Sequence, residues 1–148
     1  MIIINIANQT LEFNDKTYTI STAANGIGEI EGSYCTPLGK FKIAEKIGQN
    51  LASNSVLKGR VFTGEIYSAE LAQQHPKRDW ILTRILWLDG VESHNINTKN
   101  RYIYIHGSPD ETPMGVTGSK GCIRMHNADI IELFDRVQTL EEVAIIAS

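Results

Sequence analysis

The segment from His106 to Cys122 carries the residue types of a thiol-dependent enzyme. A cysteine attacks a carbonyl carbon as its thiolate, so a catalytic cysteine needs a base or a positive charge close to it. His106 follows an apolar, strand-like run that would hold its ring in place, and an imidazole suits general base catalysis near neutral pH. We therefore predict that Cys122 is a nucleophile and that His106 is its base.

The residues around Cys122 fit the same chemistry. Gly121 has no side chain to obstruct a substrate carbonyl, and the backbone N–H groups around it would bind a developing oxyanion. Lys120 adds positive charge, which favours a thiolate, and Arg124 offers a planar donor fork for a carboxylate. On residue type alone the structural alternative stays open, because a single cysteine is more often a small core residue.

Most of the chain has the pattern of short strands that would position this segment. Alternating or continuous apolar runs rich in β-branched and aromatic residues are typical of strands. A short helix is predicted at Ser68–Gln74, before a His-Pro pair. The predicted strands are Ile2–Ile6, Thr10–Phe13, Thr17–Ser21, Lys40–Ile47, Trp80–Leu88, Arg101–Ile105 and Val143–Ala147.

One clear helix follows the cysteine. The residues Ile130, Leu133, Phe134 and Val137 recur at helical spacing and form one apolar stripe. Asn127 is predicted to cap the N-terminus with its side chain, which gives a helix over about 128–138. The length of 148 residues suits one domain, residues 1–148, of mostly β structure.

The motifs at both ends of the His106–Cys122 segment resemble those of the L,D-transpeptidase (YkuD-type) catalytic domain. In that family a strand ends in His-Gly, and a loop then leads to Ser-His-Gly-Cys, an apolar residue and Arg. The resemblance covers most of residues 30 to 148. The matching residues are Ile105-His106-Gly107, Ser119-Lys120-Gly121-Cys122-Ile123-Arg124-Met125, Asn127, Asp129, Thr36-Pro37-Leu38-Gly39-Lys40-Phe41 and Thr83-Arg84-Ile85-Leu86-Trp87-Leu88.

This resemblance implies a β-sandwich of mixed sheets with one main α-helix packed beside it. It also implies that Cys122 is the nucleophile, that His106 is the base and that the backbone carbonyl of Gly107 orients the imidazole. The residues expected to line the substrate site are Ser119, Lys120, Gly121, Arg124 and Arg84.

The family's reaction opens the bond between diaminopimelate, the third residue of a peptidoglycan stem peptide, and D-alanine, the fourth. D-Alanine leaves, and a thioester remains on the cysteine until an amine resolves it as a cross-link or water resolves it as a carboxypeptidase. The resemblance also implies acylation by carbapenems.

Several residues depart from the family pattern or allow two interpretations. Lys120 replaces the family's histidine, and a lysine is a poor general base unless burial lowers its pKa. Arg84 fits either a substrate carboxylate or a strand-face salt bridge, and Cys35 is predicted to be structural. His94 and His126 would have to join the catalytic pair to bind zinc, but local ligand pairs such as C-x₂₋₄-C are absent. We therefore expect no metal and no cofactor.

Composition limits the partners. The net charge of -3 gives no basis for binding a polyanion, so nucleic acid is not an expected partner. No apolar stretch reaches the roughly 18 residues that span a membrane. The N-terminus lacks the basic region and long apolar run of a signal peptide, which predicts a cytoplasmic protein, or a periplasmic one if a leader has been removed. Without export, the two cysteines are expected to be free.

Three functions follow from these expectations. The first is a cytoplasmic L,D-carboxypeptidase that trims muropeptide tetrapeptides to tripeptides in wall recycling, because a cytoplasmic enzyme would meet soluble fragments and water. The second is an exported transpeptidase that makes 3-3 cross-links. The third is a non-catalytic muropeptide-binding homologue in which the change to Lys120 marks lost chemistry.

Overall fold

A computed structural model describes all 148 residues, which form mostly strands. Two 3₁₀ turns are η1 (Ser93–Asn95) and η2 (Lys99–Arg101). The helices are α1 (Ala69–Gln74) and α2 (Asn127–Arg136). The strands are β1 (Ile2–Asn5), β2 (Thr10–Phe13), β3 (Lys16–Ser21), β4 (Gly39–Ile47), β5 (Ser55–Lys58), β6 (Val61–Ile66), β7 (Leu82–Gly90), β8 (Tyr104–Ser108), β9 (Ile123–His126) and β10 (Glu142–Ile146).

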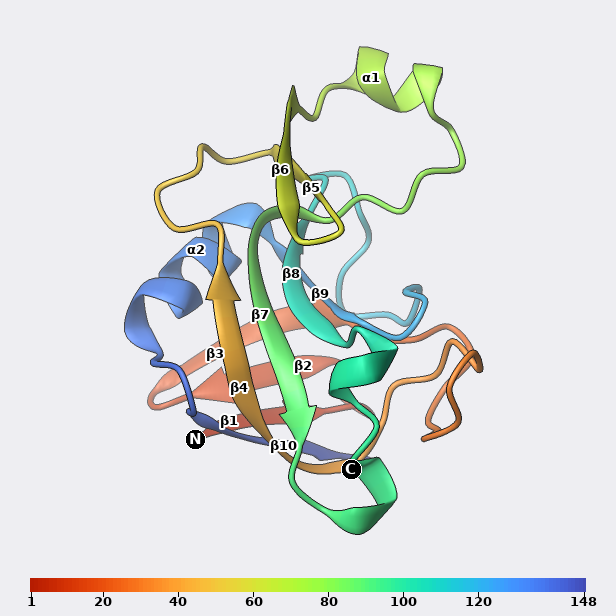
Figure 1. Ribbon diagram of the computed structural model, residues 1–148, viewed down its shortest axis with the longest axis vertical. Coiled ribbons are helices and arrows are strands. Elements are labelled where there is room, and N and C mark those ends of the chain that lie inside the picture. The colour runs from red at the N-terminus through yellow and green to blue at the C-terminus, as the bar shows by residue number, and fades with distance from the viewer.

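The strands form one mixed sheet that closes on itself. Their order is β4-β10-β1-β2-β3-β9-β8-β7-β5-β6, and β4 also pairs with β7. The β4–β7 pairing therefore closes a continuous ring of strands, in the order β4-β10-β1-β2-β3-β9-β8-β7. The β5–β6 hairpin extends from β7, outside this ring. The β1–β10 and β8–β9 pairs are parallel, while the other pairs are antiparallel. In Figure 1, β4 and β7 cross in front of β1, β2 and β10, so the closed sheet has two facing layers, as expected for mixed sheets in a mostly β fold.

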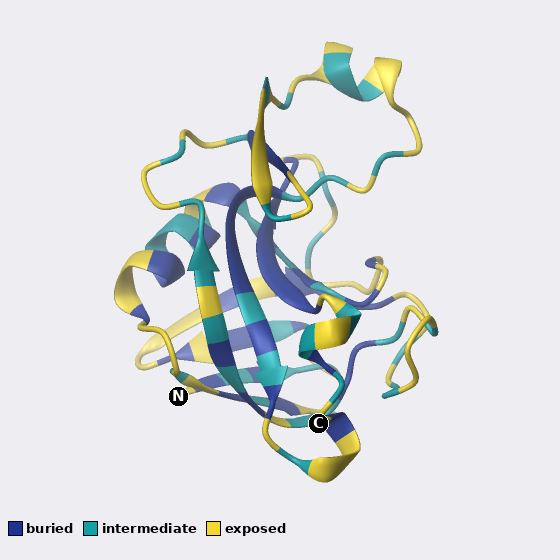
Figure 2. Ribbon diagram, viewed as in Figure 1, coloured by how far each residue is buried: buried dark blue, intermediate teal, exposed yellow.

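Two groups of buried apolar side chains lie on opposite faces of β7, β8 and β9. The main core fills the ring, with Ile105, Ile123 and Leu86 facing inward from these strands and the apolar stripe of α2 packed against them. The smaller group, which we call the outer cluster, consists of buried Leu57, Ile85 and Tyr104, with partly buried Ile47, Leu51, Ile81, Trp87 and Cys122 packed against it. Figure 2 shows β7 and β8 almost entirely buried, because both faces of these strands are covered.

The predicted main helix is confirmed, but its N-cap is not Asn127. The N-cap is His126, which makes no side-chain capping bond, and Asn127 is the first helical residue. The Asn127 amide instead accepts from Thr83 Oγ1 at 2.6 Å and donates to Asn54 Oδ1 at 2.8 Å. This buried side chain therefore joins the start of α2 to two other segments. No helix is long and apolar enough to cross a bilayer.

Most predicted strands are confirmed, with ends shifted by one or two residues. The prediction for Arg101–Ile105 is wrong in register, because Tyr102 adopts a left-handed conformation with φ 58° after η2 and the strand begins at Tyr104. His106 consequently lies inside β8 rather than at its end. The short helix is confirmed as α1, with Ser68 Oγ accepting from Leu71 N at 3.1 Å, and Figure 1 shows it standing away from the ring.

Candidate active site

Strands β8 and β9 place His106 and Cys122 on the same face of the sheet. The two strands pair in parallel, with Ile105 opposite Ile123 and His106 opposite Arg124. Ile105 and Ile123 point into the main core, so their sequence neighbours point outward because side chains alternate along a strand. Cys122 therefore lies beside Tyr104 and diagonally across from His106. Diagonal neighbours on one sheet face are close enough for longer side chains to meet.

The His106 imidazole is held by the neighbouring backbone. Its Nδ1 lies 2.7 Å from the carbonyl oxygen of Gly107, and the side chain is only 1% exposed. A carbonyl only accepts, so Nδ1 carries the proton and the neutral ring keeps a lone pair on Nε2. Burial lowers the pKa of His106, and the bond to Gly107 offsets part of that effect. The ring is therefore neutral at pH 7, which a general base requires.

A glycine is required at position 107. A Cβ there would lie 2.6 Å from Asn127 Oδ1 and 2.6 Å from the carbonyl oxygen of Leu82. Any larger residue would displace the carbonyl that orients the imidazole. The Asn127 amide network described above thus packs directly behind the base.

The Cys122 thiol is half-buried and bonded to backbone atoms. Its Sγ accepts from Tyr104 N at 3.3 Å and donates to the carbonyl of Tyr102 at 3.3 Å. Desolvation by burial raises the pKa of Cys122 to about 12, although the Tyr104 N–H acts in the opposite direction. Because the pKa is raised, the resting sulfur is a neutral thiol, and ionisation requires a base.

An ion pair between Asp79 and Arg124 lies close to both groups. Arg124 Nη2 is 2.9 Å from Asp79 Oδ1, and Nη1 donates to the carbonyl of Gly118 at 3.1 Å. Asp79 raises the pKa of both Cys122 and His106, and Arg124 lowers both. The sequence does not indicate a role for Asp79, which belongs to an apparently solvated Lys-Arg-Asp run. The Arg124 fork expected to be free for a substrate carboxylate thus already holds a carboxylate.

Ser119 and Gly121 hold the turn before Cys122 instead of facing a substrate. Ser119 is buried, and its Oγ donates to the Cys122 carbonyl at 2.6 Å and accepts from Gly121 N at 3.2 Å. Gly121 adopts φ +123°, and a Cβ there would lie 3.1 Å from the carbonyl oxygen of Cys35. Thr36 Oγ1 donates to the Gly121 carbonyl at 2.9 Å. The expected open approach at Gly121 is therefore closed by the Cys35–Thr36 segment.

Lys120 is exposed and lines a different cavity from Arg124. It lines a cavity of about 280 Å³ together with Cys35 and Arg101. The positive charge that acts on the Cys122 thiol comes from Arg124, so the expectation that Lys120 favours the thiolate finds no support. Both cysteines are free, as expected.

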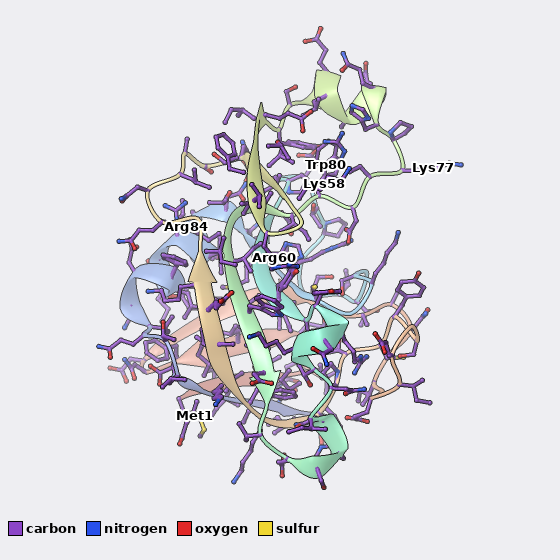
Figure 3. All side chains as sticks on the ribbon, in the orientation of Figure 1. Met1, Lys58, Arg60, Lys77, Trp80 and Arg84 are labelled. Atoms are coloured by element: carbon purple, nitrogen blue, oxygen red, sulfur yellow. The ribbon has the colours of Figure 1, made fainter.

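Arg84 does not face the site. Its Nη1 donates to the carbonyls of Leu51 and Thr83, each at 2.8 Å, and its guanidinium lies 5.4 Å from the centre of the Phe134 ring. Burial lowers its pKa. Figure 3 shows it at the α2 side of the sheet. The expectation of contact with a substrate carboxylate is therefore wrong, because Arg84 is buried against the helix that covers the opposite face.

The β5–β6 hairpin covers the outer cluster that includes Cys122. Arg60, in its turn, donates from Nη1 to Tyr104 Oη at 3.1 Å. The Arg60 guanidinium also lies 4.5 Å from the centre of the Trp87 ring and 5.1 Å from that of Tyr102. Figure 3 shows Arg60 between the hairpin and β7. One partly buried cation thus contacts the aromatic side chains around the thiol.

The histidines considered as metal ligands have other positions in the fold. His94 Nε2 is 3.0 Å from the carbonyl oxygen of Leu38. His126 ends β9 opposite Ser108 and is the N-cap of α2, so it stands on the same face of the strand as Arg124. No three His, Cys, Asp or Glu side chains gather where they could hold a metal ion.

Known proteins were compared with the chain by sequence and by fold. No curated protein sequence matches it. Among solved structures, an L,D-transpeptidase from Mycobacterium smegmatis is 14% identical and has a TM-score of 0.60, covering 99% of this chain and 58% of that chain. The match to an L,D-transpeptidase from Xylanimonas cellulosilytica (16% identity, TM-score 0.62) covers 98% of this chain and 59% of that one. The match to L,D-transpeptidase 3 from Mycobacterium tuberculosis in complex with a faropenem-derived adduct (16% identity, TM-score 0.58) covers 97% of this chain and 58% of that one.

The chain thus spans less than two thirds of these structures, and at such identities they establish its fold. The family assignment comes from the YkuD model for the L,D-transpeptidase catalytic domain, which matches residues 1–145. This chain belongs to the L,D-transpeptidase catalytic domain family.

Proposed function

We propose that this chain is a cysteine-dependent acyl-transfer enzyme that opens the L–D bond between diaminopimelate and D-alanine in peptidoglycan stem peptides. The proposed acceptor is water, which makes the enzyme an L,D-carboxypeptidase of cytoplasmic wall recycling. The observation that carries the proposal is the placement of Cys122 and His106 on one sheet face, on adjacent strands. Family membership supplies the substrate class.

In the proposed reaction, His106 Nε2 takes the proton of the Cys122 thiol as the sulfur attacks the scissile carbonyl. The Gly107 carbonyl holds the Nδ1 proton and stabilises the imidazolium that forms. The same imidazolium then protonates the departing amine of D-alanine. The N–H of Gly121 is bonded to Ser119, whereas the N–H of Cys122 makes no hydrogen bond within the chain. This leaves the Cys122 N–H as a donor for the oxyanion.

Water or an amine resolves the thioester, and both outcomes use the same residues. Attack by water regenerates the thiol and releases a tripeptide. Attack by the amine of a second stem peptide gives the 3-3 cross-link of an exported transpeptidase. The two activities are separated by the acceptor, so a single assay with and without an amine distinguishes them.

One observation favours a second candidate, a non-catalytic muropeptide binder. The thiol has a pKa of about 12 and donates to the Tyr102 carbonyl, which is the arrangement of an inert, structural cysteine. A binder would leave a tetrapeptide intact and would not form a covalent adduct.

The test is release of D-alanine from a muramyl tetrapeptide, measured with and without an amine acceptor. We expect release by the wild type and by Cys35→Ser, and none by Cys122→Ser. Release that persists in Cys122→Ser would reject the cysteine mechanism. No release by folded wild-type protein, together with measurable peptide binding, would establish the binder instead.

A further inference from the structure

A cavity of about 280 Å³ is lined by Tyr102 and Lys120, which flank the candidate nucleophile, although Cys122 itself does not line it. It lies between the turn before Cys122, the loop around Cys35 and the end of η2. The Tyr102 carbonyl accepts from the Cys122 thiol at 3.3 Å. A peptide whose scissile carbonyl sits at the sulfur would therefore have the cavity within reach of a neighbouring group.

Two cations and one carboxylate line this cavity. Arg101 is half-buried, and its Nη2 donates to the Cys35 carbonyl at 2.8 Å. Its Nη1 is buried, and no protein atom accepts from it. Buried donors are nearly always paired. This N–H group lacks an acceptor, and because solvent does not reach it, a ligand in the cavity would bond to it only after a shift of the Arg101 side chain. Lys120 is exposed and has no ion-pair partner, while Glu31 is the one acidic residue in the lining.

We propose that this cavity binds a free carboxylate of the substrate, with Lys120 and Arg101 as its cationic partners. The inference rests on the proposed function, since it names a subsite of the same reaction. A guanidinium and an ammonium together form charge-assisted hydrogen bonds to a carboxylate. The substrate offers two sources for it, namely the C-terminal carboxylate of D-alanine and the side-chain carboxylate of diaminopimelate.

Three tetrapeptides separate the sources. The parent peptide has diaminopimelate and a free C-terminus. The first analogue has a C-terminal amide, and the second analogue has lysine in place of diaminopimelate. The dissociation constants are measured by calorimetry on a Cys122→Ser background, so the test does not require turnover. The same comparison of kcat/KM is made with active protein. Lys120→Met removes the charge of an exposed side chain, Lys120→Arg keeps it, and Lys77→Met is the matched control on a loop that Figure 3 shows pointing into solvent.

We expect the unmodified Lys120 protein to prefer the parent over one analogue, which identifies the bound carboxylate. Lys120→Met should weaken parent binding about two- to fivefold, the range of an exposed ion pair, and leave that analogue unchanged. Lys120→Arg and Lys77→Met should keep the preference. An equal loss for all three peptides, or a preference that survives Lys120→Met, would overturn the subsite. If the dissociation constants change as expected but the active protein releases no D-alanine, the proposed catalysis is rejected and the carboxylate subsite is still supported.

Discussion

The role of His106 can be tested through the pH dependence of Cys122 acylation. Burial raises the pKa of Cys122 to about 12, so roughly one thiol in 100,000 is ionised at pH 7 without help. An ordinary cysteine with a pKa of about 8.5 is ionised in roughly 3% of molecules. Without a base, the thiolate fraction of Cys122 should thus be about three thousandfold lower than that of an exposed thiol. Acylation at pH 7 must depend on proton transfer to the imidazole.

The wild type and His106→Ala should therefore have different pH profiles. Burial disfavours the imidazolium and lowers the pKa of His106. The neutral base is therefore already present at pH values somewhat below about 6.5, the pKa of an ordinary histidine. The wild-type rate should reach a plateau by about pH 6.5. His106→Ala should lose about 10²- to 10⁴-fold at pH 7. Its rate should then rise tenfold per pH unit up to about pH 11, because only direct ionisation of the thiol remains.

The assay is intact-mass measurement of adduct formation with imipenem, an antibiotic bound in a solved L,D-transpeptidase structure. Cys35→Ser should behave as the wild type, and thermal unfolding should show that His106→Ala is folded. A plateau near neutral pH in His106→Ala would refute both the base assignment and the raised thiol pKa. An adduct on Cys35 would show that the wrong cysteine has been assigned.

Three further changes test the surroundings of the thiol. Asp79→Asn removes a charge that raises the pKa of the buried imidazole, so the acid limb of the acylation profile should move to lower pH. An unchanged profile would contradict the proximity of Asp79 to His106. Arg60→Ala loosens the aromatic side chains over the outer cluster, so iodoacetamide should modify Cys122 several-fold faster than in the wild type, as measured by peptide mapping. Gly121→Ala should destabilise the fold by about 1–3 kcal/mol and slow acylation. Gly115→Ala, also at positive φ but with open space around its Cβ, should cost less in thermal unfolding and leave acylation unchanged.

The parts of the fold that sequence patterns predict are those whose side chains face one continuous core. The stripe of α2 is such a case, because Ile130 and Leu133 recur at helical spacing on a single buried face. Strands with alternating apolar residues, such as β3, are another. The hairpin strands β5 and β6 were not predicted, because β6 is almost wholly exposed and carries no apolar alternation to mark it.

The candidate pair was predicted, but its surroundings were not. Asp79 and Arg60 reach the site from turns and loops that are far away in the sequence, and local spacing gives no information on such contacts. Arg84 was expected in the site because it belongs to a strand motif that resembles the family's. The strand has a bulge near Thr83, which adopts φ 76°, and Arg84 is directed toward α2 instead. Charged residues are therefore placed reliably only after the faces of the strands are known.

Strand β9 connects the core to the chemistry. Its sequence alternates, so that Ile123 and Met125 enter the main core while Cys122 and Arg124 point to the outer face. A shift of one residue in its pairing with β8 would bury the guanidinium and expose the isoleucine, at a large free-energy cost. Burial of the apolar residues thus fixes the register that brings the sulfur beside Tyr104. The turn at Gly121 only has to connect the preceding loop to β9. Ile123 and Met125 therefore determine the sheet face on which Cys122 and Arg124 stand.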